Sequence, residues 1–223
     1  TLRVNPTTAE IARIHRRQEE LARERQAQHA KAHESATTAD GHRVAIEANI
    51  GGLADAQQAL TLGADGVGLF RSEFLFLHRA TAPTDEEQRA AYADVARTLG
   101  RDRRLVIRTL DVGGDKPLSY LPLPREDNPF LGERGVRVML NRPELLRAQL
   151  RAILLAAREG SIAVMFPMIA SIDEWRAVRD VLESERQKLD APRIEAGIMI
   201  EVPSAALIAD HFAAEVDFFS IGT

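Results

Sequence analysis

Short apolar runs alternate with longer amphipathic stretches along most of this chain. The apolar runs predict strands at residues 44–50, 66–71, 105–111, 162–168, 196–201 and 217–221. Between the runs, apolar residues recur at helical spacing, as Leu146, Leu150 and Ile153 do. Strands that alternate with helices are typical of βαβ units, so the pattern predicts an α/β fold built on a parallel sheet.

The amphipathic stretches carry their own helix-start signals. Thr84 with Glu87, and Ser171 with Glu174, have the spacing of capping boxes, in which two side chains satisfy free N–H groups at a helix start. Trp175 follows the second box in an amphipathic row. That position predicts packing in the core rather than stacking on a ligand.

Residues 7–35 differ from the rest of the chain because they are mostly polar, with only a sparse apolar row. This composition predicts an exposed helix, which we interpret as a spacer or docking arm. Asp40 and Gly41 then mark a turn. We therefore divide the chain into a linker helix at residues 1–38 and an α/β domain at residues 39–223.

Composition narrows the class of protein. The 223 residues are 45% hydrophobic and 28% charged, with a net charge of −4. The arginines form no basic block and the apolar runs are too short to span a bilayer, so neither a nucleic-acid partner nor a membrane is indicated. The start lacks a secretory pattern and the sequence has no cysteine, which favours a cytoplasmic setting.

Two architectures suit about six parallel strands in a chain of this length. One is an open doubly wound sheet, and the other is a (β/α)8 barrel that lacks its last units. No Gly-x-Gly-x-x-Gly turn follows the first predicted strand, so a dinucleotide-binding fold has no positive support. The pattern alone leaves both architectures open.

Charged residues close three of the predicted strands, namely Arg71, Arg108 and Glu201. The carboxyl ends of parallel strands form the ligand-binding face of α/β folds, so these side chains are expected to meet at one mouth. A lone arginine at a strand end is more often half of an ion pair. Together, guanidinium groups that suit phosphate oxygens and a carboxylate that suits a hard cation indicate phosphoryl transfer.

A long loop at residues 111–133 is the second unusual stretch. Loops of this length are uncommon in compact folds unless they bind or cover a ligand. Gly113 and Gly114 would let backbone amides approach an anion, and Lys116 is one of three lysines in an arginine-rich chain. Lys116 suits a solvated turn equally well, and Arg134 after the loop is ambiguous by itself.

Five segments resemble one protein family. They are residues 66–76 (GVGLFRSEFLF), 108–116 (RTLDVGGDK), 126–132 (EDNPFLG), 165–168 (MFPM) and 217–223 (DFFSIGT). They are similar to the phosphoenolpyruvate (PEP)-binding domain of enzyme I, the PEP-protein phosphotransferase of the bacterial sugar transport system. The resemblance covers nearly the whole chain, and its motifs occur in the family's order.

The resemblance implies a (β/α)8 TIM-type barrel, here truncated after about six strands, with PEP as phosphoryl donor, Mg²⁺ as cofactor and a homodimer. It implies that Arg71 and Arg108 bind PEP and that Glu201 binds Mg²⁺. Lys116 and Arg134 occupy positions where the family places further cations near the phosphate. The phosphoryl group would pass to a histidine on a separate amino-terminal domain and then to the carrier protein HPr.

The sequence also departs from the family. The family continues the last motif with Asn-Asp, whose Asp is a second Mg²⁺ ligand, and later supplies an arginine and a cysteine. This sequence ends at Thr223 and has no cysteine, so we expect the chain as it stands to bind PEP weakly and to be inactive. The alternatives are a PEP-binding domain like that of pyruvate phosphate dikinase or PEP synthase, and an inactive dimerisation or binding module. Plain enzyme I, a nitrogen-system paralogue and a multiphosphoryl fusion all remain open as the parent.

Overall fold

The structure is a computed structural model that describes residues 4–77, 79–114, 118–123, 126–128 and 131–222. The strands are β1 (Glu47–Ile50), β2 (Gly66–Arg71), β3 (Arg104–Arg108), β4 (Ser161–Phe166), β5 (Glu195–Ile200) and β6 (Phe218–Ile221). The α-helices are α1 (Thr8–Lys31), α2 (Leu53–Thr61), α3 (Asp85–Leu99), α4 (Val136–Asn141), α5 (Pro143–Ala156), α6 (Ile172–Lys188), α7 (Pro203–Leu207) and α8 (Ala209–Ala213). A 3-10 turn, η1 (Ser72–Leu75), follows β2.

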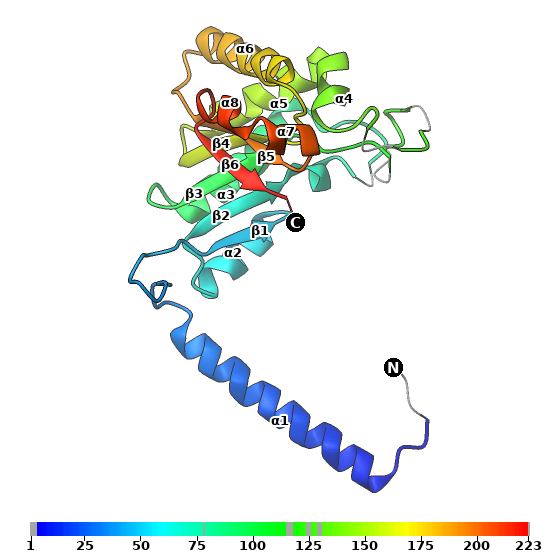
Figure 1. The fold of residues 1–223 in the computed structure, drawn as a ribbon, viewed down its shortest axis with the longest axis vertical. Helices are drawn as coiled ribbons and strands as arrows, with labels where there is room; N and C mark the ends of the chain where they lie inside the picture. Colours follow the sequence, from blue (N-terminus) through cyan, green and yellow to red (C-terminus); the bar gives the residue numbers. More distant parts are fainter. Residues whose placement is uncertain (1–3, 78, 115–117, 124–125, 129–130, 223) are drawn as a thin grey trace.

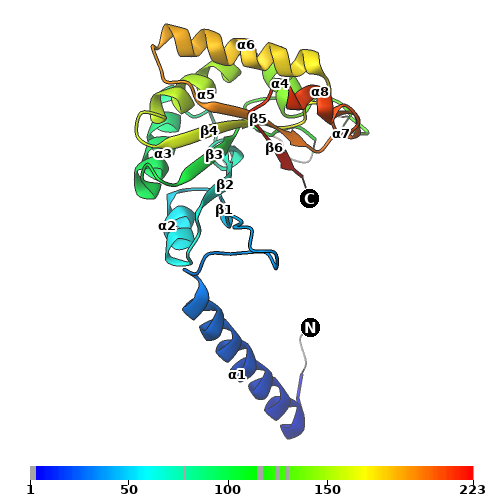
Figure 2. The same cartoon turned by 60° about the vertical axis from the view of Figure 1, so that its left-hand side comes forward.

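The strand order decides between the two architectures. Within the described residues the sheet has six parallel strands in the order β1-β2-β3-β4-β5-β6. A doubly wound sheet reverses its order at a switch point, whereas this order never reverses. Figure 2 shows α2, α3, α5 and α6 following one another around the outside of the curled sheet. The sheet is therefore a half-barrel, and the predicted α/β class with a partial TIM-type barrel is confirmed.

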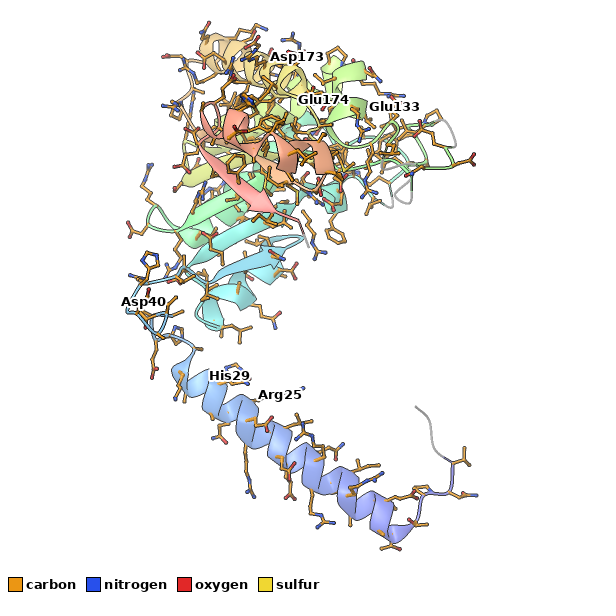
Figure 3. The ribbon with its side chains drawn as sticks, in the orientation of Figure 1. Arg25, His29, Asp40, Glu133, Asp173 and Glu174 are labelled. Carbon is orange, nitrogen blue, oxygen red and sulfur yellow. The ribbon has the colours of Figure 1, made fainter. Side chains whose placement is uncertain are left out.

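The outer face of the sheet carries the main core. In β3, Leu105 and Ile107 face the helices and are fully buried, because side chains alternate between the two faces of a strand. Phe166 at the end of β4 meets Trp175 of α6 edge-on, with ring centroids 6.1 Å apart. The prediction that Trp175 packs in the core is confirmed, as are the capping boxes that begin α3 and α6. Figure 3 labels the Glu174 of the second box.

The inner face of the sheet is different. The small apolar cluster there consists of Val106, Ala163, Met165 and Met199. Arg104 and Arg108 flank Val106 on the same face of β3, since the side chains of alternate residues point the same way. The inner face is therefore partly apolar and partly charged, which suits a ligand site more than a packed core.

Helix α1 stands away from the half-barrel as a separate rod (Figure 1). All 24 of its residues are described, and none of them is buried. Its side chains, among them Arg25 and His29, project into open space (Figure 3). The predicted exposed helix is confirmed, although it ends at Lys31 rather than near residue 35. No helix in the described ranges is long and apolar enough to cross a bilayer.

Several predicted strands are too long at one end. Strand β1 begins at Glu47 instead of residue 44, and β3 ends at Arg108 instead of residue 111. After Arg108 the next backbone N–H, that of Thr109, still donates to Met165 O at 2.9 Å. The N–H of Leu110 instead donates to the side-chain oxygen of Gln149 at 2.8 Å, so the chain leaves the sheet ladder there.

Candidate functional site

A groove of about 690 Å³ runs along the inner face of the half-barrel. Its lining comes from β1, β2, β3, β5 and β6: Glu47, Asn49, Gly68, Leu69, Arg71, Arg104, Val106, Arg108, Met199, Glu201, Phe218, Phe219, Ser220, Ile221 and Gly222. Arg71, Arg108 and Glu201, which the sequence places at three strand ends, all line this groove. Segments more than 100 residues apart in the sequence thus contribute to one site.

Arg108, the last residue of β3, is held by two carboxylates. Its Nη2 lies 2.5 Å from Glu73 Oε1 and 3.5 Å from Asp111 Oδ2, and all three side chains are buried. Its Nη1 lies 3.7 Å from the sulfur of Met199, which lines the groove. Its Nε is buried without a hydrogen-bond partner among the described residues. The guanidinium is therefore anchored by Glu73 and Asp111 in a residue that lines the groove.

Arg71, the last residue of β2, is held by an aromatic ring. Its guanidinium carbon lies 4.9 Å from the centroid of Phe74, a distance at which the ring attracts a cation. Phe74 in turn lies against Gly51, where an added Cβ would come within 2.8 Å of the ring. Within the described chain, the buried Nε of Arg71 has no hydrogen-bond partner. A second guanidinium thus lies at the groove, in contact with the ring of Phe74.

Glu201 follows β5 and is oriented by the backbone of the neighbouring β4 turn. The N–H of Met168 donates to Glu201 Oε1 at 2.7 Å. Met168 has φ +61°, a left-handed backbone conformation that residues other than glycine rarely adopt. The Met168 turn ends the regular strand and aims its N–H at the carboxylate. Glu201 therefore enters the groove with one oxygen already fixed.

Arg134 takes a different place from the other predicted cations. It is buried, and its Nε and Nη2 lie 3.1 and 3.4 Å from the two carboxylate oxygens of Asp111. It is not part of the groove lining within the described residues, and it reaches Arg108 through the shared Asp111. Lys116, predicted to lie near the phosphate, falls outside the described residues.

Gly113, in the loop at residues 111–133, packs closely against another part of the chain. A Cβ added at Gly113, whose φ is +128°, would lie 2.5 Å from Glu133 O and 2.9 Å from the Cα of Arg134. The loop therefore passes so close to the segment that carries Arg134 that only glycine fits there. Glu133 itself, labelled in Figure 3, bonds Arg142, which lowers the pKa of its carboxyl.

The two carboxylates that contact Arg108 were not predicted from the sequence. Glu73 comes two residues after Arg71, yet it pairs with Arg108, 35 residues further along the chain. Asp111 ends the third predicted strand and was not singled out as a site residue. The groove residues Glu47 and Asn49 were also missed. Their signal is visible in hindsight, because polar residues alternate with Ala48 and Ile50 in β1.

Comparison with known proteins places the chain in a family. Residues 24–223 match the family described as PEP-utilising enzyme, PEP-binding domain. The chain belongs to this family. The PEP-binding-domain match begins within α1 and covers the whole half-barrel with its groove.

Named relatives of this PEP-binding domain cover the same span. A PEP-protein phosphotransferase of Staphylococcus carnosus is 46% identical over 99% of this chain and 39% of its own length. One of Haemophilus influenzae is 48% identical, over 99% of this chain and 39% of its own length. A multiphosphoryl transfer protein of Xanthomonas campestris is 48% identical over 100% of this chain and 26% of its own length. The chain thus spans less than half the length of these relatives.

Proposed function

We propose that this chain binds PEP in the inner groove and serves a PEP-protein phosphotransferase, which passes the phosphoryl group to a histidine on a separate domain and then to HPr. The observation that carries the proposal is the pair of anchored guanidiniums, Arg71 and Arg108, beside the carboxylate of Glu201 in one groove. The names of the relatives support a phosphotransferase over the dikinase and synthase alternatives. A homodimer and a cytoplasmic location belong to the same proposal and rest on the resemblance to enzyme I.

Arg71 and Arg108 supply positive charge where the phosphoryl group carries negative charge. Phosphoryl transfer proceeds through a loose transition state, so catalysis depends on positioning and electrostatic stabilisation. Donors that are already fixed need no reorganisation when the reaction occurs. Glu73 and Phe74 fix the two guanidiniums from outside the groove lining, which leaves the remaining N–H groups for oxygens of PEP.

The groove residues also fit Mg²⁺. This cation binds through one or two carboxylates and completes its coordination with waters and substrate phosphate oxygens. Glu201 offers such a carboxylate beside the two arginines. Among the described residues no group of three or more His, Cys, Asp or Glu side chains could hold a metal by itself, so PEP oxygens would complete the site. Bound Mg²⁺ would neutralise negative charge that develops on the phosphoryl group and on the pyruvate enolate that PEP leaves behind.

Arginine variants of the full-length protein test the proposal. We expect Arg71→Ala and Arg108→Ala each to lower the rate of phosphoryl transfer by roughly 100-fold or more, the scale for one electrostatic donor. Arg176→Ala is the matched control, since Arg176 pairs with Glu215 and does not line the groove. Calorimetric titration with PEP and Mg²⁺, beside a phosphotransfer assay with HPr, provides the readout. Wild-type kinetics in Arg71→Ala or Arg108→Ala would overturn the assignment.

A further inference from the structure

Gln149 is a fully buried polar residue in the apolar face of α5. Its neighbours along this face, Leu146, Leu150 and Ile153, are fully buried as well and belong to the main core. Leaving an amide without partners in such a place destabilises the folded state. A glutamine at this position therefore needs hydrogen bonds, and the structure provides them.

The amide of Gln149 makes three hydrogen bonds to three separate segments of the chain. Its Oε1 accepts from the backbone N–H of Leu110 at 2.8 Å. Its Nε2 donates to Ser72 Oγ at 3.1 Å and to the hydroxyl of Tyr92 at 3.0 Å. Burial raises the pKa of Tyr92, so the phenol stays protonated. Both ends of the amide are thus used.

Two of these bonds reach the turns that carry the groove arginines. Ser72 directly follows Arg71, and Leu110 lies two residues after Arg108. Strands β2 and β3 pair up to these last residues, where Arg71 is the register partner of Arg108. Beyond that point the ladder ends, and the side chain of Gln149 continues the connection between the two turns.

The same two turns carry the carboxylates that hold Arg108. Glu73 follows Ser72, and Asp111 follows Leu110. Both carboxylates lie within 3.5 Å of Arg108 Nη2. A shift of one turn against the other would therefore pull Glu73 or Asp111 away from that nitrogen. If Gln149 only satisfied the backbone N–H of Leu110, its side-chain oxygen would be enough. Its amide nitrogen also donates to Ser72 in the other turn, so the side chain links the two turns.

We propose that Gln149 is a positioning residue that keeps the Arg71 and Arg108 turns in register for PEP. The inference rests on the proposed function, because it assumes that these arginines bind PEP. Displacing a binding group by about 1 Å can lower a rate roughly 100-fold. Loss of Gln149 therefore affects catalysis without removing any group that touches the substrate.

Gln149→Met in the full-length protein tests this role, because methionine has a similar size but cannot bridge the two turns. Tyr92→Phe is the matched control: it removes one partner of the same amide and leaves the bonds to Ser72 and Leu110. Both variants should unfold at a lower temperature than the wild type. Measured well below both unfolding temperatures, Gln149→Met should lower kcat/KM for PEP at least about tenfold, and Tyr92→Phe should stay within about twofold of wild type.

The outcomes separate the positioning role from the proposed function. The positioning role is wrong if Gln149→Met folds and keeps the wild-type kcat/KM for PEP. It is also wrong if Tyr92→Phe lowers kcat/KM as much as Gln149→Met does. If Gln149→Met does not fold, Ser72→Ala decides, because it breaks the tie on the β2 side alone. A several-fold loss of kcat/KM in Ser72→Ala would support the role, and no loss would overturn it. Inactive Arg71→Ala and Arg108→Ala beside a fully active Gln149→Met would leave the proposed function intact.

Discussion

The two faces of the sheet use the same strands for different purposes. The outer face packs large apolar side chains such as Phe166 and Ile107 under the helices and forms the main core. The inner face holds a small apolar cluster and the charged groove. In β3 the division is visible residue by residue, since Leu105 and Ile107 point outward and Arg104 and Arg108 point inward.

Stability and ligand binding therefore depend on largely separate residues, and a few residues serve both. Substitutions on the outer face should lower the free energy of unfolding and leave the groove intact. Substitutions of exposed groove residues should weaken ligand binding and leave the free energy of unfolding nearly unchanged. Arg108 and Gln149 are the exceptions, because each joins buried structure to the groove.

The largest expected effect lies on the outer face. Trp175→Ala should lower the free energy of unfolding by about 3–5 kcal/mol, because it leaves a cavity in a close-packed core. Denaturant unfolding measures this loss. Ile11→Ala on α1 is the control and should change the free energy of unfolding by less than about 0.5 kcal/mol, since Ile11 is 42% exposed. A loss below about 1 kcal/mol in Trp175→Ala would contradict the packing account.

Arg108 and Arg71 should differ in what their loss does to stability. Arg108→Ala leaves Glu73 and Asp111 buried with a partner removed, so it should cost about 3 kcal/mol of unfolding free energy. Arg71→Ala removes a cation held by the half-exposed Phe74 ring and should cost about 1 kcal/mol or less. Thermal and denaturant unfolding of the two variants compare them directly. Equal losses would mean that the buried network does not anchor Arg108.

Glu201→Gln should act on the groove alone. A neutral amide is a weaker ligand for a hard cation, so the Mg²⁺ concentration for half-maximal activity should rise about tenfold or more. Asn49, another groove residue, provides the comparison as Asn49→Ala, with a smaller rise expected because it carries no charge. Activity against Mg²⁺ concentration is the measurement. An unchanged curve for Glu201→Gln would assign Glu201 to holding the Met168 turn only.

A smaller effect belongs to the start of α3 on the outer layer. Thr84→Ala removes the side chain that accepts from the N–H of Glu87 and should cost about 1 kcal/mol of unfolding free energy. Phosphotransfer at saturating PEP should not change. Thr84→Ser is the matched control, because serine keeps the hydroxyl. A loss in Thr84→Ser equal to that in Thr84→Ala would show that the cap hydroxyl is not responsible.

The smallest expected effect is the loss of stability at low pH that Glu87 causes. The hydrogen bond from Arg79, with that from the Thr84 backbone, lowers the pKa of Glu87 from 4.5 to about 2. A carboxyl whose pKa is lower in the folded state adds stability above its unfolded pKa and loses it as pH falls. The contribution of Glu87 to the stability of the folded state should therefore be lost as the pH falls from about 4.5 to about 2. Unfolding temperatures against pH should fall less steeply in Glu87→Gln than in the wild type, and parallel curves would contradict this.

Much of the fold and part of the site follow from local sequence patterns. The alternation of strands and helices, both capping boxes and the core position of Trp175 depend on neighbours within a few residues, so they were predictable. The singly wound order was not, because it depends on which strands pair. Strand β4 ends at Phe166, before Pro167 and the left-handed turn at Met168, although the apolar run was predicted to continue as a strand to residue 168.

The missed site residues act over long sequence separations. Glu73 and Arg108 are 35 residues apart, and Gln149 and Ser72 are 77 apart. A carboxylate in a polar turn and a glutamine in a helix carry no local sign of such partners. Arg71, Arg108 and Glu201, which line the groove, could be chosen as candidates because a charge that ends an apolar strand is itself a local signal.

A crystal structure of the full-length protein with PEP and Mg²⁺ would show whether PEP binds in the inner groove. We expect PEP in the inner groove, with its oxygens within hydrogen-bond distance of Arg71 and Arg108 and with Mg²⁺ bound by Glu201. We also expect Arg108 to keep its bond to Glu73 in the complex, because Glu73 does not line the groove. PEP bound elsewhere, or bound in the groove without contact to either arginine, would show that the groove is not the PEP site.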